Sequence, residues 1–265
     1  IDVLIKKNFK IENIPVRYYR GKNKSKNEIL PIMIYFHGGG WVLGNTDTHD
    51  QVCSLLVNKG RYDLISVEYS LAPEAIFPKA INEGKKILKS IYKNKFGLNI
   101  NNNKIILCGD SAGGNIATVL ANYNKNILKA NVILQVLFYP ATHMFGKYDS
   151  KNRYDGLILN KKLMEWFEDH YCPKKIRKKY INDSRLSPIK NKKMTNMPDT
   201  LIVLAECDPL YDEGQLYGKK LQESNVKVEM KVYKGLMHGF LTMGGAIKEV
   251  RSVINFTNKK INNFL

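Results

Sequence analysis

The sequence predicts an α/β fold in which a mostly parallel sheet carries helices on both faces. Short apolar runs rich in β-branched and aromatic residues alternate along the 265-residue chain with segments whose apolar residues recur at helical spacing. Strands that alternate with helices pair in parallel, because each helix returns the chain to the same end of the sheet. A chain of this length needs neither a metal nor disulfides to form a stable core.

The predicted strands are apolar runs bounded by turn-forming residues. The first two, residues 11–19 and 32–36, are separated by a turn-rich segment at residues 21–27. The others are residues 64–69, 104–108, 132–138, 200–205 and 226–233. We expect these runs to form the central sheet.

Helices are predicted where apolar residues recur every three or four positions. The clearest case is residues 80–92, where four aliphatic side chains lie on one side: Ile81, Ile87, Leu88 and Ile91. The other predicted helices are residues 48–59, closed by Gly60, residues 115–123, and a C-terminal helix within residues 245–265. We expect these helices to cover the two faces of the sheet.

The segment from residue 142 to residue 197 breaks this alternation, since it is far too long for a simple connection between two strands. It contains a predicted helix at residues 161–171 and most of the chain's concentrated lysine. In α/β proteins such an excursion often covers the site at the carboxyl edge of the sheet. We therefore expect one domain over residues 1–265, with a partial lid at about residues 142–197.

The net charge of +18, from 42 basic and 24 acidic residues, suggests nucleic acid or an anionic membrane surface as a partner. However, only seven of the basic residues are arginines. Recognition of bases and phosphates favours the arginine fork, whereas scattered lysine is typical of a solvated surface. We therefore predict no nucleic-acid partner. No apolar run is long enough for a transmembrane segment, and peripheral contact with a membrane stays open.

Cysteine and histidine usage predicts neither a disulfide framework nor a metal site. The four cysteines are widely spaced and form no C-x-x-C pair, so we expect reduced, mostly buried thiols: Cys53, Cys108, Cys172 and Cys207. Three histidines lack partners at ligand spacing: His49, His143 and His170. Residues 47–50 are instead expected to form the N-cap of a helix. The chain shows no secretory leader, which favours the cytoplasm.

The strongest local signal is the motif G-D-S-A-G at residues 109–113, which fits G-x-S-x-G. A predicted strand precedes it and a predicted helix follows, as a nucleophile elbow requires. So sharp a turn leaves no room for side chains at Gly109 and Gly113. Ser111 is then expected to adopt a strained conformation with its hydroxyl above the sheet edge. The alternative is a tight glycine-rich turn without chemistry.

A second motif, H-G-G-G-W at residues 37–41, follows the predicted strand at residues 32–36 directly. Three glycines allow backbone N–H groups to turn toward a carbonyl oxygen, which is what an oxyanion hole needs. Neither glycine-rich phosphate-binding pattern is present. The alternative is a flexible turn.

A serine hydroxyl needs a base to take its proton, and the base needs an acid to orient it. Asp208 and His238 each follow a predicted strand, so both are expected at the same sheet edge as Ser111. Their order along the chain, Ser-Asp-His, is that of the α/β-hydrolases. Glu206 and Asp212 compete for the acid's role, but Asp208 is preferred because it lies directly past the strand, where a side chain can still reach the loop of the histidine.

Five segments in this order and spacing make the chain resemble the hormone-sensitive-lipase-like group of α/β-hydrolase esterases, which includes bacterial carboxylesterases and arylacetamide deacetylases. They are residues 35–41, 67–74, 109–114, 208–214 and 238–240. The resemblance covers nearly the whole chain. It implies an α/β-hydrolase fold and an enzyme without metal or organic cofactor.

Residue by residue, the resemblance implies Ser111 as nucleophile, His238 as base and Asp208 as the acid. The N–H groups of three residues would form the oxyanion hole: Gly39, Gly40 and Ala112. His37 would hold that loop without carrying a proton.

The chain departs from the group in two places. The usual Asp-Tyr-Arg is Glu-Tyr-Ser at residues 68–70, where no catalytic role is affected. Only 36 residues precede His37, and most of them are predicted to form strand. The N-terminal cap helices of the group are therefore expected to be missing.

These observations predict a serine carboxylesterase that acts on short-chain esters through an acyl-enzyme. An amide or N-acyl hydrolase with the same residues is an alternative, as is a basic lipase at a membrane surface. A non-catalytic ligand-binding module of the same fold is a third, although such modules lack the catalytic histidine. The expected partner is a small-molecule ester, and the protein is expected to be a monomer or homodimer.

Overall fold

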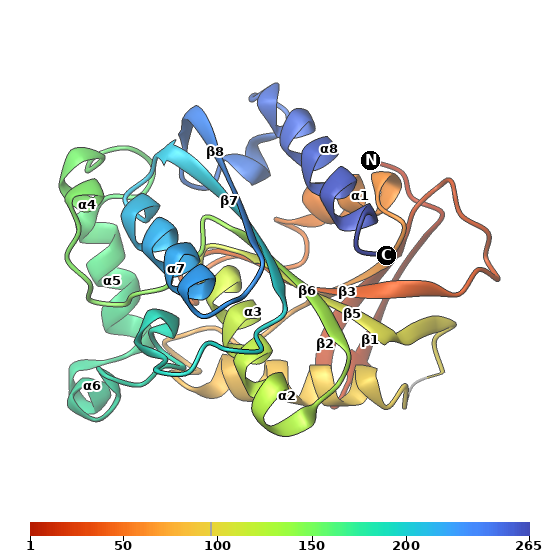
Figure 1. Cartoon of the computed structure of the whole chain (residues 1–265), viewed down its shortest axis with the longest axis horizontal. Coiled ribbons are helices and arrows are strands. Elements are labelled where there is room, and N and C mark those ends of the chain that lie inside the picture. Colours follow the sequence, from red (N-terminus) through yellow and green to blue (C-terminus); the bar gives the residue numbers. More distant parts are fainter. Residues whose placement is uncertain (96) are drawn as a thin grey trace.

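A single mixed sheet organises the molecule in the computed structural model, which describes residues 1–95 and 97–265 (Figure 1). Within these residues, eight strands pair in the order β1-β2-β4-β3-β5-β6-β7-β8. Strand β2 is antiparallel to both β1 and β4, and all the other pairs are parallel. The strands are β1 Ile5–Ile11, β2 Ile14–Arg20, β3 Leu30–Phe36, β4 Asp63–Val67, β5 Ile100–Asp110, β6 Val132–Phe138, β7 Asp199–Cys207 and β8 Val228–Met237. The mostly parallel sheet predicted from the sequence is confirmed.

The prediction of one strand over residues 11–19 is wrong, because a hairpin turn interrupts that segment. Glu12 and Asn13 join β1 to β2 and have φ angles of 51° and 65°. Two consecutive residues with positive φ make the tight turn that matches the twist of a hairpin. Strand β1 was not predicted, since it lies at the sheet edge and alternates poorly between apolar and polar residues.

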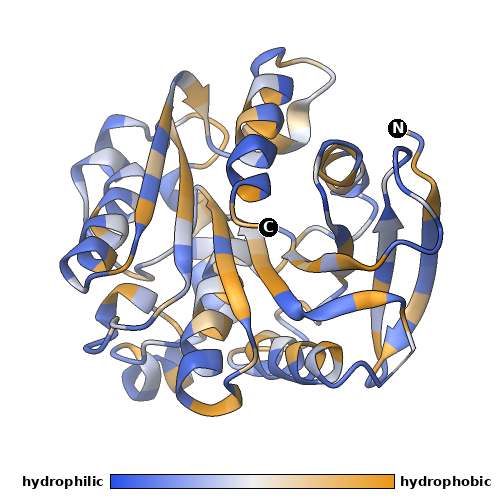
Figure 2. Cartoon of the chain, turned by 45° about the vertical axis from the view of Figure 1, so that its right-hand side comes forward, coloured by the Kyte–Doolittle hydropathy of each residue, from blue (hydrophilic) through white to orange (hydrophobic). Residues whose placement is uncertain are grey.

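Helices cover both faces of the sheet, as predicted. On one face, α1 (Asp50–Lys59) and α8 (Glu249–Asn262) pack against the sheet and share one hydrophobic core with it. On the other face, the second core contains α2 (Lys79–Tyr92), α3 (Ala112–Tyr123) and α7 (Tyr211–Glu223). Figure 2 shows mainly hydrophobic residues along the central strands and more hydrophilic ones at the N-terminal edge.

Helix α7 was not predicted, because small residues make much of its contact with the sheet. A Cβ atom on Gly214 would lie 2.7 Å from Leu204 Cδ2, and one on Gly218 would lie 2.3 Å from Met230 Sδ. The glycines therefore allow the helix backbone to approach the sheet closely, without the apolar spacing on which the prediction of helices depends.

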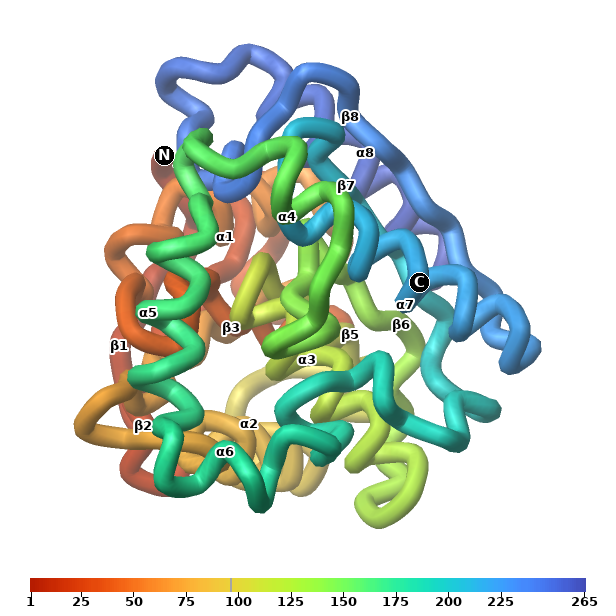
Figure 3. The backbone as a smooth tube through the Cα atoms, turned by 90° about the vertical axis from the view of Figure 1, so that its left-hand side faces the viewer, coloured from red at the N-terminus to blue at the C-terminus, as the bar shows by residue number. Residues whose placement is uncertain are grey.

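The excursion at residues 142–197 lies between β6 and β7 and contains three α-helices among its described residues (Figure 3). They are α4 (Asp149–Arg153), α5 (Lys161–Tyr171) and α6 (Lys174–Tyr180). The predicted helix at residues 161–171 is confirmed, with the side chain of Asn160 accepting a hydrogen bond from the Leu163 N–H at its start. Helix α6 was not predicted; it has no fully buried residue, and its two apolar side chains, Ile176 and Tyr180, are only partly buried against the core.

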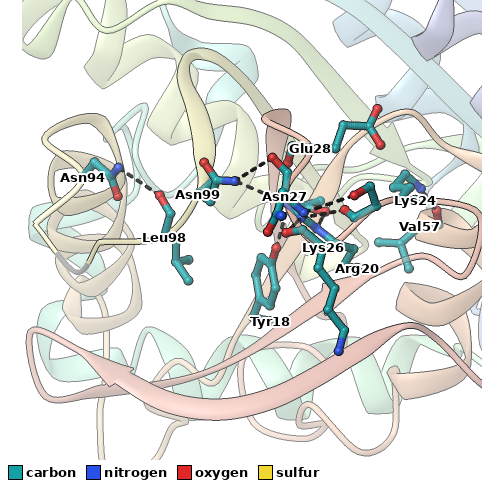
Figure 4. Close-up of polar contacts among 12 residues, drawn as sticks. Tyr18, Arg20, Lys24, Lys26, Asn27, Glu28, Val57, Asn94, Leu98 and Asn99 are labelled. Atoms are coloured by element: carbon teal, nitrogen blue, oxygen red, sulfur yellow. Dashed lines mark hydrogen bonds and ion pairs between the residues drawn. The ribbon is translucent and has the colours of Figure 1, made fainter.

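A buried ion pair ties the antiparallel end of the sheet together. Arg20 and Asp63 are 1% and 0% exposed, and Arg20 Nη2 lies 2.5 Å from Asp63 Oδ2. Tyr18 donates a hydrogen bond to the same carboxylate at 2.7 Å. The guanidinium also donates to four backbone carbonyls (Figure 4). Three of them, of Ser25, Lys26 and Glu28, belong to the connection between β2 and β3, and the fourth is that of Asn99. Both charges are therefore fully hydrogen-bonded.

The four cysteines are free thiols, three of them buried and Cys207 partly exposed. In the part of the chain that the structure describes, no helix has the length and hydropathy needed to span a bilayer.

Candidate active site

Ser111 occupies a sharp turn between a strand and a helix. Strand β5 ends at Asp110, α3 begins at Ala112, and Ser111 between them has φ 54° and ψ −118°. An added Cβ on Gly113 would lie 1.9 Å from the Phe36 carbonyl oxygen. One on Gly109 would lie 2.4 Å from the backbone of Gly113. The strained serine and the need for both glycines agree with the geometry predicted for a nucleophile elbow.

The structure brings Ser111, His238 and Asp208 together. The Ser111 Oγ lies 2.9 Å from His238 Nε2, and His238 Nδ1 lies 2.8 Å from Asp208 Oδ2. Strands β7 and β8 pair in parallel with Cys207 opposite Met237. The residues that follow, Asp208 and His238, therefore leave the sheet side by side. All three side chains are buried, with exposures of 8% for Ser111, 8% for His238 and 0% for Asp208.

The two competing carboxylates have other partners. Glu206 accepts a hydrogen bond from the Gly235 N–H at 2.9 Å. Asp212 accepts one from the Ser150 N–H at 2.8 Å. Asp208 alone among these three acids lies within hydrogen-bond distance of the His238 ring.

The hydrogen bonds of His238 determine its tautomer. A carboxylate only accepts hydrogen bonds, so Nδ1 carries a proton and donates it to Asp208. In the neutral ring Nε2 is then free to accept the Ser111 hydroxyl proton. Burial alone lowers the pKa of His238, but the charge and hydrogen bond of Asp208 outweigh burial and raise that pKa above its ordinary value of 6.5.

The loop after β3 holds the glycines predicted for an oxyanion hole. Gly39 and Gly40 have φ angles of 113° and 60°, which an L-residue rarely adopts. A Cβ on Gly40 would also lie 2.2 Å from the Phe167 ring, so the excursion at residues 142–197 packs directly on this loop. Ala112 is the first residue of α3, and its N–H therefore has no partner within the helix.

A largely apolar cavity of about 530 Å³ opens above Ser111. Its floor includes Gly39, Gly40 and His238. Six hydrophobic residues of the excursion also line the cavity: Met144, Ile158, Leu159, Leu163, Met164 and Phe167. Residues far from the motifs in sequence thus shape the space in which a bound molecule would lie.

Two carboxylates near the cavity were not singled out by sequence reasoning. Asp110 accepts hydrogen bonds from the Tyr35 hydroxyl at 2.7 Å and from the Gly38 N–H at 2.9 Å. Glu213 Oε1 accepts from the N–H groups of Thr142 and His143, and Lys151 Nζ lies 3.2 Å from Glu213 Oε2. Both acids lie within motifs identified above. Their position, in motifs at the carboxyl ends of buried strands, is the sequence signal that could have indicated them.

The remaining histidines have other partners. His37 is buried and stacks on Tyr69 at 4.2 Å between ring centroids, and burial lowers its pKa to about 4. His143 Nδ1 contacts the Tyr148 hydroxyl at 2.6 Å, and His170 Nδ1 contacts a backbone carbonyl of its own helix. Among residues 1–95 and 97–265, no group of three or more His, Cys, Asp or Glu side chains is arranged to hold a metal ion.

Comparison with known proteins places these features in one family. Residues 33–242 match the family described as alpha/beta hydrolase fold. The chain is 34% identical over 238 residues to ethyl acetate hydrolase of Pseudomonas putida, which covers 89% of this chain and 74% of that protein. It is 33% identical over 236 residues to carboxylesterase NlhH of Mycobacterium tuberculosis, covering 87% of this chain and 72% of that one.

The solved structure of a hyperthermophilic esterase from the archaeon Pyrobaculum calidifontis superposes with a TM-score of 0.93 at 34% identity. The superposition covers 99% of this chain and 86% of the archaeal chain. The chain therefore belongs to the alpha/beta hydrolase fold family and, within it, to the hormone-sensitive-lipase-like group of esterases that its motifs predicted.

Proposed function

We propose that the protein is a serine carboxylesterase that hydrolyses short-chain esters through an acyl-enzyme. The observation that carries the proposal is the continuous set of contacts from Ser111 Oγ through His238 to Asp208, beneath an apolar cavity. Each contact is within the distance needed for proton transfer or for orienting the base. Relatives named as ester hydrolases support the same reaction.

In the proposed mechanism, the Ser111 oxygen attacks the ester carbonyl carbon while His238 Nε2 takes the hydroxyl proton. Asp208 stabilises the imidazolium that forms. His238 then gives its proton to the departing alkoxide, so that an alcohol leaves and the acyl group stays on Ser111. Water attacks this acyl-enzyme with His238 again as base, which releases the carboxylic acid and restores the serine.

The N–H groups of Gly39, Gly40 and Ala112 are proposed to bind the negative oxygen of the tetrahedral intermediate. Gly39 and Gly40 have the positive φ angles that let a loop turn its N–H groups toward a ligand. Ala112 adds the free N–H of a helix N-terminus. Each such donor contributes about 3–4 kcal/mol to the stability of the transition state.

We also propose that residues 142–197 act as a lid within a single domain. The lid's side chains line the cavity, and Phe167 packs on the oxyanion loop. The cavity of about 530 Å³ would hold a short acyl chain together with its alcohol.

Hydrolysis of p-nitrophenyl acetate, butyrate, octanoate and laurate tests this proposal. We expect acetate and butyrate to have the highest kcat/KM, and laurate to fall roughly tenfold or more below butyrate because its chain exceeds the apolar cavity. A fluorophosphonate probe should label Ser111, with the modified peptide identified by mass spectrometry. Absence of both hydrolysis and labelling would refute the esterase assignment, whereas a preference for laurate would refute only the substrate class.

The pH dependence of kcat/KM should report the state of His238. The base must be neutral, so activity is lost as pH falls through its pKa, which the Asp208 carboxylate raises above 6.5. We therefore expect an acid limb with its inflection above pH 6.5. In Asp208→Asn the stabilising charge is gone, so the inflection should move to lower pH while the plateau falls. An unchanged inflection in this variant would contradict the assignment of Asp208.

A further inference from the structure

A second histidine–aspartate pair lies beside the nucleophile, and the mechanism above does not use it. His49 Nε2 is 3.3 Å from Asp110 Oδ1 and 3.4 Å from Oδ2. The side chains of His49 and Asp110 are 6% and 4% exposed. Both residues line the cavity above Ser111. Helix α1 begins here with His49 at the N-cap position, but the predicted side-chain cap is absent among the described residues.

The contacts of His49 place a proton on the ring nitrogen that faces Asp110. Nε2 faces the Asp110 carboxylate, which only accepts hydrogen bonds, so Nε2 donates to it. On the other side of the ring, Nδ1 lies 2.9 Å from the Thr48 hydroxyl oxygen. The Thr48 hydroxyl in turn lies 2.9 Å from the Asn45 carbonyl oxygen, so the ring is held from both sides.

The electrostatics of the surrounding titratable groups favour this contact. Burial opposes the charge on His49, but Asp110 outweighs burial and raises the pKa of His49. The nearby His37 ring, 5.5 Å away, is neutral at pH 7 because burial lowers its pKa to about 4. Burial raises the pKa of Tyr35 well above its usual value, so its hydroxyl stays protonated and can donate to Asp110.

Asp110 connects the nucleophile to the oxyanion loop. Its backbone directly precedes Ser111, while its Oδ1 accepts the N–H of Gly38, the first glycine of the loop. A Cβ on Gly38 would lie 2.4 Å from Asp110 Oδ2, although Gly38 has no positive φ. The glycine at position 38 is thus explained by the close approach of this carboxylate. Strand pairing agrees, because Phe36 lies opposite Gly109 and the loop leaves the sheet beside the elbow.

We propose that Asp110 and His49 are positioning residues for the oxyanion hole. The Asp110 carboxylate, which accepts a hydrogen bond from His49 Nε2, holds the Gly38 N–H and so sets the orientation of the Gly39 and Gly40 N–H groups relative to Ser111. The pair touches no reacting atom. The expected effect on kcat rests on the proposed esterase function. The contact between Asp110 and the loop does not depend on that function.

Kinetics of four variants test the proposal, each assayed at least about 15 °C below its own Tm so that all are folded. Asp110→Leu removes the acceptor at similar volume, and we expect kcat to fall about 100-fold with KM within about twofold, as for loss of one oxyanion donor. His49→Phe removes the hydrogen-bond donor to Asp110 and should lower kcat about tenfold, whereas His49→Gln, which keeps a donor, should recover most of that loss. The double variant His49→Phe/Asp110→Leu should be no slower than Asp110→Leu, because both residues act through the same contact.

Hydrogen exchange provides a readout independent of activity. The peptide spanning residues 36–44 should exchange faster in Asp110→Leu and in His49→Phe than in the wild type. His170→Gln, a histidine replaced on the lid outside the cavity, is the control and should match the wild type in both kinetics and exchange.

The proposal is overturned if folded Asp110→Leu keeps wild-type kcat, if the effects of the two single variants multiply, or if exchange at residues 36–44 is unchanged. If Asp110→Leu does not fold, the His49 variants and their exchange decide the question alone. Failure of the wild type to hydrolyse any ester would count against the proposed function, whereas the exchange comparison would still test the positioning role.

Discussion

Replacing Ser111 by alanine is expected to lower kcat for ester hydrolysis by roughly 10⁵–10⁶-fold with little change in stability. The side chain is small and its hydroxyl donates only to His238, so its loss leaves no large cavity. His238→Ala should cost about as much, because the hydroxyl is a poor nucleophile without a base. The double variant should be no slower than either single variant, since the two residues act as a unit.

Asp208→Asn should be less severe, at about 10⁴-fold, because the amide keeps the shape of the carboxylate but favours the wrong histidine tautomer. Steady-state kinetics with p-nitrophenyl butyrate would measure all four variants, and circular dichroism would confirm that each is folded. Retention of more than about 1% of wild-type kcat in Ser111→Ala would remove Ser111 from the mechanism. Glu206→Gln is the matched control for Asp208→Asn and should keep the wild-type rate. Among the described residues, the Glu206 carboxylate accepts a hydrogen bond from the Gly235 N–H and makes no hydrogen bond with His238.

The largest loss of stability is expected at the opposite end of the sheet, from Asp63→Ala. Arg20 is 1% exposed, and its guanidinium would be left in the core without a counter-charge. Removing one partner of a buried ion pair destabilises a protein by about 3–5 kcal/mol. Arg20→Met should cost a similar amount, because it leaves the Asp63 carboxylate paired only with Tyr18 and breaks the contacts to the connection between β2 and β3.

Unfolding in guanidinium chloride, followed by circular dichroism, would measure these losses. The double variant Arg20→Met/Asp63→Leu should be more stable than either single variant, because it leaves no unpaired charge in the core. Glu229→Gln is the matched control: its ion pair with Lys260 is half-exposed, so the free energy of unfolding should change by less than about 0.5 kcal/mol. A loss below about 1 kcal/mol in Asp63→Ala would contradict the role assigned to the buried pair.

The local elements of the fold could be predicted wherever packing and periodicity agree. Strand β6 and helix α5 have the predicted bounds because their apolar residues match the faces they bury. The β1–β2 hairpin and helix α7 could not be predicted in the same way. The hairpin depends on two residues that strand pairing holds at positive φ. Helix α7 depends on glycines that matter only because the sheet lies so close to the helix backbone.

The sequence by itself determined which residues could carry chemistry at Ser111, His238 and the glycines after β3, because the motifs place them at strand ends. The sequence also favoured Asp208 over its neighbours Glu206 and Asp212, but only the tertiary structure shows which of the three acids contacts His238. That choice depends on the parallel register of β7 and β8, which sets Cys207 opposite Met237 and aims one carboxylate at the histidine.

The Asp110–His49 pair shows the same limit more clearly. Each residue lies in a segment whose sequence is consistent with an ordinary turn or helix start. Their significance arises because β3 and β5 pair with Phe36 opposite Gly109, which brings a loop N–H, a carboxylate and an imidazole into one buried site. A sequence sets the chemistry of each side chain, but distances between residues far apart in the chain exist only after the sheet has paired, and hydrogen bonds depend on those distances.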